Sequence, residues 1–356
     1  MKNGVIDEIG EIIQTQDRLL AFGSKTKTAI EAPSGVTTLD MSKVKGILEY
    51  VPSEYTFTAL AGTRLDEIDQ MLAENSQFLP FDPPLIKKGG TLGGTVAANL
   101  SGPGRYHYGG VRDFVLGVQF FDGQARLIRS GGKVVKNAAG FDIPKLMVGS
   151  LGSLGALVEL SFKVFPRPKE YKTVISSYPT LINAMEHLIQ LTASPIEILC
   201  LEIEPTNNSY DLRIRLGGSA KLFDGRIDRL KQFVDDIEVL EGEAESMYWE
   251  HINEFRWPPE DSTLVKVPLT PKLVPGLDDF LQQNRSIRRY SVGANVAWIA
   301  WSKPLDKLDQ HLKDSNLAGL TILGSADLIR LGAWDTGNFY QRIKNALDPN
   351  EKWSEM

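Results

Sequence analysis

"GGTLGGTVAANLSGPGRYHYGG" runs from Gly89 to Gly110, and eight of its residues are glycine. Glycine inside regular structure costs about 0.5–1 kcal/mol relative to alanine, because more backbone freedom is lost on folding. A flexible linker would tolerate so much glycine, but linkers contain few apolar residues, and Leu92, Val96 and Leu100 are interleaved here at helical or turn spacing. The stretch therefore indicates a backbone that approaches a ligand closely while its apolar side packs against a core. A cluster of turns without a ligand is the alternative.

Length and composition limit the class of protein. The 356 residues are many for one domain, so two domains are expected. The net charge of -6 argues against nucleic-acid binding, which would need a basic surface. No run approaches the roughly 18 apolar residues of a membrane span, and the N-terminal "MKNGVIDEIG" has no apolar signal core. A cytoplasmic protein is therefore expected.

Cysteine and histidine usage restricts the redox and metal chemistry of the chain. Cys200 is the single cysteine, so the chain forms neither an internal disulfide nor a four-cysteine iron–sulfur cluster of its own. The four histidines are scattered, without HxH or HExxH spacing. We therefore expect no histidine-based metal site.

The glycine content and the order of strand and helix patterns change near Pro168. Before it, glycine-rich loops separate strand and helix patterns, such as an alternating strand at 55–62 followed by an amphipathic helix at 63–75. After it, glycine becomes rarer and strand-like runs alternate with helical ones. This pattern predicts an α+β second domain with an antiparallel sheet.

Four loops of the first half could bind a ligand: 22–26, 89–110, 131–146 and 149–159. None fits the common nucleotide motifs, because no GxGxxG follows a strand with an acidic residue about 20 positions on, and GxxxxGK[ST] is absent. Several such loops can nevertheless bind an extended anion together through backbone N–H groups. The nearby cationic side chains are those of Lys25, Arg112 and Lys136.

Three segments resemble a known family. "TLGGTVAANLSGP" (91–103), "YGGVRDFVLGV" (108–118) and "GGKVVKNAAGFDIPKLMVGSLGSLGALVELSFKVFPRP" (131–168) are similar to the FAD-binding domain of the vanillyl-alcohol-oxidase type, also called PCMH type. Within that group they most resemble the E-type FAD-binding subunits of bacterial glycolate oxidase. The resemblance is dense over 55–168 and only a general pattern afterwards.

The resemblance implies a PCMH-type FAD-binding domain over 1–170 and an α+β cap domain over 171–356, whose last helix could return to the first domain. It also implies non-covalent FAD, since "FGSKTKT" contains no histidine or cysteine that could be a covalent tether. The first loop and the glycine run would face the FAD diphosphate, and Val158 would touch its adenine or ribose. The cofactor-binding residues implied in this way are Gly23, Ser24, Lys25, Thr26, Thr91, Gly93, Gly94, Gly102, Arg112, Asp113, Lys136, Asn137, Gly140, Asp142, Gly149, Ser150, Gly152, Gly155 and Val158.

Simpler interpretations exist for some of these residues. Arg112 and Asp113 could form an ion pair that fixes a turn, and Lys136 and Asp142 could form a solvent-exposed pair. Arg288 and Arg289 could bind a carboxylate, but exposed charge is the favoured interpretation. Aromatic residues of the second half are candidates for part of a partner surface: Tyr248, Trp249, Phe255 and Trp257, or Trp298 and Trp301.

The implied function is that of an FAD-binding subunit in a glycolate oxidase-like complex. It would oxidise a small 2-hydroxy acid, glycolate to glyoxylate, by hydride transfer to the flavin. Its partners would be a second flavin subunit and an iron–sulfur subunit, which could hold it at the inner face of the membrane. The sequence assigns no catalytic residue and no metal. The alternatives are a stand-alone FAD-dependent enzyme for another alcohol or D-lactate, and a non-catalytic scaffold subunit that keeps the flavin fold.

Overall fold

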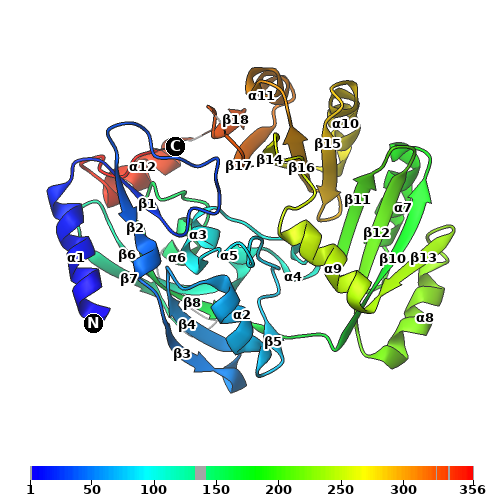
Figure 1. Cartoon of the computed structure of the whole chain (residues 1–356), viewed down its shortest axis with the longest axis horizontal. Coiled ribbons are helices and arrows are strands. Elements are labelled where there is room, and N and C mark those ends of the chain that lie inside the picture. The colour runs from blue at the N-terminus through cyan, green and yellow to red at the C-terminus, as the bar shows by residue number, and fades with distance from the viewer. Residues whose placement is uncertain (1, 133–141, 326, 336, 356) are drawn as a thin grey trace.

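The computed structural model of the protein describes residues 2–132, 142–325, 327–335 and 337–355. The chain forms two lobes, which lie side by side in Figure 1 and are joined between β9 (Phe165–Pro166) and β10 (Glu170–Tyr178). The first lobe contains, in chain order, α1 (Lys2–Thr15), β1 (Leu19–Phe22), β2 (Thr37–Asp40), β3 (Ile47–Val51), β4 (Thr56–Leu60), α2 (Leu65–Ala73), β5 (Gln77–Phe78), α3 (Leu92–Ala97), α4 (Arg105–Tyr108), α5 (Val111–Phe114), β6 (Val115–Phe121), β7 (Leu127–Gly131), α6 (Ile143–Met147), β8 (Ala156–Lys163) and β9.

The first lobe is built on a five-stranded antiparallel sheet with the order β3-β4-β8-β6-β7. The tip of the β6–β7 hairpin is fixed by Asp122, whose carboxylate accepts the N–H groups of Gln124 and Arg126, both at 2.9 Å. The helix α3 follows Thr91, which caps it and accepts the N–H of Gly94 at 3.3 Å. A separate parallel pair, β1 and β2, lies beside this body and leads into the loop that begins at Gly23.

The second lobe is built on a nine-stranded sheet with the order β13-β10-β12-β11-β15-β16-β14-β17-β18, in which all pairs are antiparallel. The α+β class with an antiparallel second sheet is therefore confirmed. Its elements after β10 are α7 (Leu181–Thr192), β11 (Cys200–Pro205), β12 (Tyr210–Gly218), α8 (Ala220–Leu230), β13 (Ile237–Glu241), α9 (Gly242–Asn253), β14 (Thr263–Pro268), α10 (Val274–Gln283), β15 (Ile287–Ser291), β16 (Val296–Trp301), α11 (Leu305–Asp314), β17 (Ala318–Leu323) and β18 (Arg330–Gly332).

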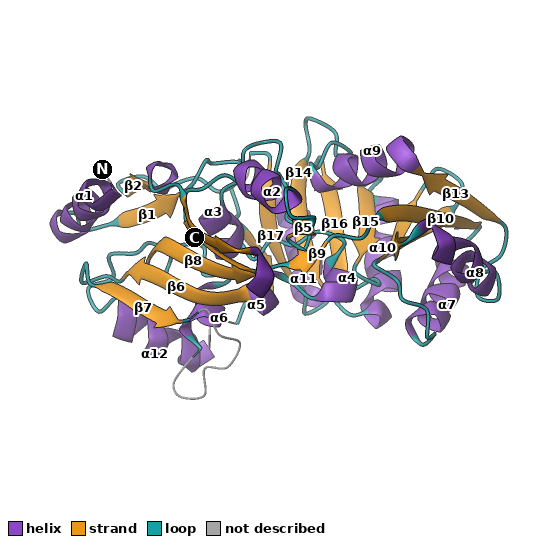
Figure 2. Ribbon diagram, turned by 90° about the horizontal axis from the view of Figure 1, so that it is seen from below, coloured by secondary structure: helices purple, strands orange, loops and turns teal. Residues whose placement is uncertain are grey.

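The two faces of this sheet have different chemistry. Figure 2 shows α7 on one side and α9 on the other. The α7 side is the apolar core of the lobe, to which Ile203, Tyr290 and Ile299 contribute. On the opposite side, the register places Arg289 across from Trp298, and Trp298 across from Lys266. We call this second side, which carries α9, the charged face.

After β18 the chain returns to the first lobe. The helix α12 (Gly337–Leu347) packs against the first core through Tyr340, Ile343 and Leu347. The ammonium of Lys344 donates to the carbonyl of Ser153 at 2.6 Å. The described part of the first lobe therefore consists of residues 2–132, 142–168 and 337–355.

Candidate functional site

Three of the glycine-rich stretches meet in one cleft of the first lobe, which we call the glycine cleft. It consists of two adjoining cavities with volumes of about 60 and 40 Å³. The end of β1 and the 23–27 loop form one wall, α3 forms another, and residues 151–157 close the cleft from the side. Both cavities are lined by Ala21, Phe22, Gly23, Thr91, Gly94 and Ala97.

Gly94 is the glycine that keeps the cleft open. A Cβ atom at this position would lie 3.0 Å from Thr91 Oγ1 and 3.5 Å from Lys27 Nζ, inside the space between the first loop and α3. Gly152 lies on another wall and has φ +81°, a left-handed conformation that favours glycine. Both positions therefore bring backbone close to whatever fills the cleft.

The first loop rests directly on the glycine run. A Cβ at Gly23 would lie 2.1 Å from Thr91 Oγ1, and the hydroxyl of Ser24 donates to the carbonyl of Gly89 at 2.6 Å. Sequence segments more than sixty residues apart are thereby fixed as two sides of one site. The structure thus brings Gly23, Ser24 and Thr91 together, as the resemblance implied.

Several polar groups at the glycine cleft have no protein partner. Thr26 Oγ1 and Ser150 Oγ are buried and form no hydrogen bond among the described residues. Thr26 lines the cleft, and Ser150 precedes Leu151, which also lines it. Buried hydroxyl groups are normally hydrogen-bonded, so two such groups on two predicted ligand loops indicate a polar ligand.

Lys27 is a site residue that the sequence analysis missed. It lines the cleft, and burial lowers the pKa of its ammonium to about 8. Lys25, which was predicted, also lines the cleft, but it is exposed and its Nζ lies 5.2 Å from the centroid of the Phe22 ring. The sequence "SKTK" (24–27) could have indicated Lys27, because it places a second lysine two residues after Lys25 in the same loop.

Other predicted glycines serve close packing within the protein. A Cβ at Gly93 would lie 2.8 Å from the Cβ of Ala61, and one at Gly102 would lie 2.3 Å from the carbonyl oxygen of Asp82. Gly155, with φ +145°, would bring a Cβ to 2.4 Å from the carbonyl oxygen of Phe121, whereas Gly149 has φ +83° and faces Asn99. These glycines let α3 and neighbouring loops approach the sheet, with Gly93 and Gly155 also lining the cleft.

The remaining predicted residues lie elsewhere. Arg112 is exposed and donates to the carbonyl of Lys145 at 3.4 Å, while Asp113 accepts the N–H of Gly110 at 2.8 Å, so the geometry favours turn-fixing roles. Asp142 caps α6 by accepting the N–H of Lys145 at 3.3 Å. Val158 lies in the core under β1 with no exposed surface. Lys136, Asn137 and Gly140 lie outside the described residues.

Lys266 is a second residue that sequence reasoning missed. It lies on β14 at the junction of the two lobes, is 6% exposed, and donates to the carbonyl of Asn99 at 2.8 Å. Burial, with a smaller contribution from Arg105, lowers the pKa of Lys266 to about 7. A lysine inside the otherwise apolar run "TLVKVPL" was the available signal.

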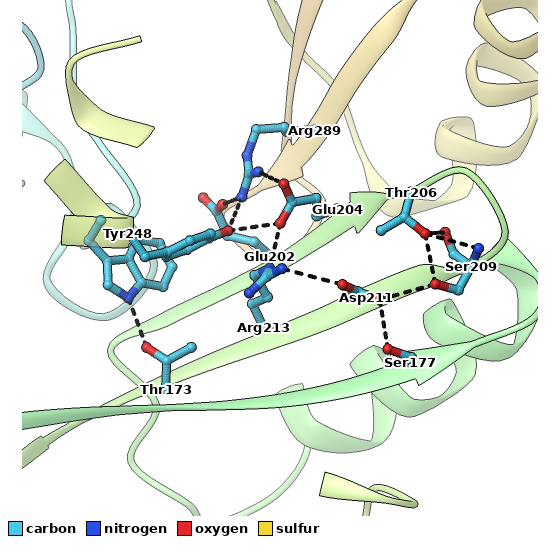
Figure 3. Close-up of polar contacts among 11 residues, drawn as sticks. Thr173, Ser177, Glu202, Glu204, Thr206, Ser209, Asp211, Arg213, Tyr248 and Arg289 are labelled. Carbon is cyan, nitrogen blue, oxygen red and sulfur yellow. Dashed lines mark hydrogen bonds and ion pairs between the residues drawn. The ribbon is translucent and has the colours of Figure 1, made fainter. Parts of the chain in front are cut away.

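The charged face carries a network of buried ion pairs, shown in Figure 3. The guanidinium of Arg289 donates to Glu202 at 2.9 Å and to Tyr248 at 2.5 Å, and it pairs with Glu204 at 2.5 Å. Arg213 pairs with Glu204 from the other side, also at 2.5 Å. The expectation of exposed charge at Arg289 is therefore wrong, because the sheet register and α9 enclose this side chain.

The expected aromatic partner surface is also wrong for most of its members. Trp249, Phe255, Trp298 and Trp301 are all buried. Trp298 and Phe255 pack against each other with ring centroids 4.7 Å apart, between the two lobes. Tyr248 belongs to the ion-pair network. Trp257 packs against the apolar cluster between the lobes, which includes Leu100, Phe255 and Trp298 and which we call the junction cluster. Helical spacing of aromatic residues could not distinguish a core from an exposed surface.

Comparison with known proteins identifies the class. A family model described as an FAD binding domain matches residues 4–131, which include the first loop and the glycine run. Alkyldihydroxyacetonephosphate synthase has a similar fold, with a TM-score of 0.72 at 16% identity over 98% of this chain and 73% of that chain. The fold is thus that of a PCMH-type FAD-binding protein, as the sequence predicted.

The relatives define the family more closely. Glycolate oxidase subunit GlcE of Escherichia coli (strain K12) is 31% identical over 97% of this chain and 93% of its own length. Glycolate oxidase subunit GlcD of Bacillus subtilis (strain 168) is 30% identical over 56% of this chain and 45% of its own length. The mitochondrial D-lactate dehydrogenase (cytochrome) of Arabidopsis thaliana is 27% identical over 48% of this chain and 30% of its own length. The chain belongs to the family of glycolate oxidase subunit GlcE, and its cofactor is FAD.

The glycine cleft fits this cofactor. FAD carries a diphosphate, and the cleft offers such an anion the unpaired hydroxyl of Thr26 and the ammonium of Lys27. Among the described residues, no cluster of three or more histidine, cysteine, aspartate or glutamate side chains is arranged to hold a metal ion. No helix in the described part of the chain has the length and hydropathy needed to cross a bilayer.

Proposed function

We propose that the chain is the FAD-binding subunit of a glycolate oxidase-like complex that oxidises a small 2-hydroxy acid, glycolate to glyoxylate. The observation that carries the proposal is the convergence of three glycine-rich loops on one cleft, which is also lined by Lys27 and by Thr26 with its unpaired hydroxyl. The similarity to GlcE over nearly the whole chain supports the assignment to such a complex.

Bound FAD would supply the acceptor for a hydride from the α-carbon of the substrate. The protein's own contribution would begin with the backbone at Gly23, Gly94 and Gly152, which line the cleft and would hold the cofactor. The apolar junction cluster, which includes Leu100 and Trp298, excludes water beside it. Lys266 donates to the carbonyl of Asn99 and so fixes the end of α3 against the second lobe. We assign no described side chain as the base for the hydroxyl proton.

The proposed partners are a second flavin subunit, resembling GlcD, and an iron–sulfur subunit. A chain with one cysteine cannot hold a four-cysteine cluster that would pass electrons onward singly. The relationship to a protein named as a subunit supports this arrangement. We propose a cytoplasmic complex that can lie at the inner face of the membrane through these partners.

A specific observation favours the scaffold alternative. Leu264, Trp298 and Ile322 of the second lobe form one buried cluster with Phe22, Ile30 and Leu100 of the first. The two lobes therefore touch directly beside the glycine cleft, with Phe22 and Ile30 in both the cluster and the cleft wall. A subunit that binds FAD but leaves substrate oxidation to its GlcD-like partner would have this feature.

The test is a visible spectrum of the purified chain, followed by glycolate-dependent dye reduction by the chain alone and by the chain co-purified with a GlcD-type partner. We expect a flavin spectrum and activity only with the partner. Turnover by the chain alone in the common range of about 1–10³ per second would establish the stand-alone enzyme instead. D-lactate in the same assay would separate the two substrates. A colourless chain that FAD cannot reconstitute would overturn the proposed function and support a scaffold that keeps the fold without the cofactor.

A further inference from the structure

The ammonium of Lys27 has no counter-ion in the protein. Among the described residues, no hydrogen bond or ion pair involves its side chain, whereas the neighbouring Ser24 hydroxyl is satisfied by Gly89. Its Nζ lies 3.5 Å from the place where a Cβ of Gly94 would be, so the side chain points across the glycine cleft toward α3. The hydroxyl of the adjacent Thr26 is unpaired as well.

The elements that surround Lys27 offer it no negative charge. Helix α3, with the sequence "LGGTVA", and the 150–155 turn, with the sequence "SLGSLG", contain no charged residue. Lys25, on the same loop, is exposed and lies over Phe22. Taking an ammonium out of water without a partner is costly, and burial is the cause of the lowered pKa of Lys27. A lysine with a purely structural role would be expected to reach a carbonyl, as Lys266 reaches Asn99.

We propose that the Lys27 ammonium forms an ion pair with the FAD diphosphate. The cofactor would then provide the negative charge that no described residue of the protein provides to this lysine. The proposal goes beyond FAD binding by backbone N–H groups, because it assigns a specific side-chain charge to the site. It rests on the glycine cleft being the FAD site.

Binding should then be coupled to a proton. Burial lowers the pKa of Lys27 to about 8 in the protein without FAD, and a bound diphosphate would raise it. Below about pH 8 the lysine already carries its proton, and FAD binding takes up almost none. Above about pH 8, FAD binding should take up close to one proton, and affinity should fall as the pH rises toward the pKa of the complex.

The experiment is an FAD titration of the purified full chain after removal of bound flavin, comparing wild type, Lys27→Met and the control Lys45→Met, at an exposed lysine of the same lobe that lines neither cavity of the cleft. At neutral pH we expect Lys27→Met to raise the Kd for FAD at least about tenfold, the size typical of a lost charge-assisted hydrogen bond. Lys45→Met should change it less than about threefold. Calorimetry in two buffers of different ionisation enthalpy at about pH 9 should find proton uptake in wild type and Lys45→Met, and none in Lys27→Met.

Thermal melting of the cofactor-free proteins separates this role from a structural one. Lys27→Met should melt at neutral pH at the wild-type temperature or slightly above it, since methionine avoids burying an unpaired charge. Weaker FAD binding together with a lower melting temperature would overturn the proposal in favour of a structural role. An unchanged Kd, or unchanged proton uptake, in Lys27→Met would overturn it while leaving FAD binding intact. Failure of the wild type to bind FAD would overturn the proposed function as well.

Discussion

In the second lobe, Arg289 is 2% exposed and its guanidinium contacts both Glu202 and Glu204 (Figure 3). In the glycine cleft, Lys27 points into a hollow lined by glycine and has no such partner. The two sites enclose cations of equal charge in one chain. The charged face compensates its arginine with its own carboxylates, whereas the cleft leaves its lysine uncompensated.

The comparison distinguishes two kinds of buried charge. The charge of Arg289 is paired within the fold, whereas the charge of Lys27 has no partner among the described residues and is available to a ligand. A buried ion pair contributes little net stability, but removal of one partner leaves the other uncompensated and is strongly destabilising. Removal of an uncompensated charged group should have the opposite effect on stability. The free energy of unfolding should stay the same or rise, because no unpaired charge is buried, while the affinity for the ligand should fall. Substitutions on the two sides should therefore move stability and FAD affinity in different directions.

The largest effect is expected at the charged face. Arg289→Met leaves Glu202 and Glu204 without their principal cation, and we expect it to lower the free energy of unfolding by about 3–5 kcal/mol. Denaturant titration measures this loss. Arg129→Met, which breaks a pair with Glu159 at an exposed arginine, should cost no more than about 1 kcal/mol. Equal losses in the two variants would contradict a structural role of the network.

A second effect concerns Lys266 and pH. Its pKa is about 7 in the folded protein and 10.5 ordinarily, so the unfolded chain binds more protons between these values. The free energy of unfolding should therefore rise with pH across this window and be lower below it. Lys266→Met should remove about 2–4 kcal/mol of that rise, measured by denaturant titration from about pH 6.5 to 10. Lys272→Met, at an exposed lysine, serves as the control and should leave the rise intact.

A smaller effect is expected from closing the cleft. Gly94→Val would place a branched side chain between Thr91 and Lys27, so FAD affinity should fall at least about tenfold while the fold loses about 1–3 kcal/mol. Flavin fluorescence titration gives the affinity. Gly225→Val is the matched control, because a Cβ there would meet nothing within 4 Å. Full affinity in Gly94→Val would show that FAD lies elsewhere.

The smallest effect tests the bond to the cofactor. The first loop has no histidine or cysteine, and Cys200 is buried in the second lobe, where burial raises the pKa of its thiol and keeps it neutral. Acid precipitation should therefore release all of the yellow colour into the supernatant. Fluorescence that stays with the denatured band on a gel would show a covalent flavin and would require a nucleophile outside the first loop.

The sequence predicted the ligand loops better than the side chains around them. Glycine spacing located Gly94 and Gly152 because backbone access is a local property. Both Lys25 and Lys27 line the cleft, but Lys25 is exposed, whereas burial lowers the pKa of Lys27, and that burial depends on the packing around the loop. Val158, which the resemblance implied as a contact of the adenine or ribose, lies on the central strand β8 with its side chain in the core. Burial of Arg289 depends on pairing between distant strands, which no local pattern encodes.

The return of the chain after β18 has a consequence for the order of folding. The strand β1, which leads into the first loop, is bonded to the C-terminal segment: Leu19 N–H donates to the carbonyl of Lys352 at 2.7 Å, and the carbonyl of Leu19 accepts the N–H of Ser354 at 2.9 Å. Contacts between residues so far apart in sequence form slowly, because a long loop must close first. A ribosome will have made residue 354 before this wall of the cleft can be completed. Completion of the cleft is therefore a late event, which follows synthesis of both lobes.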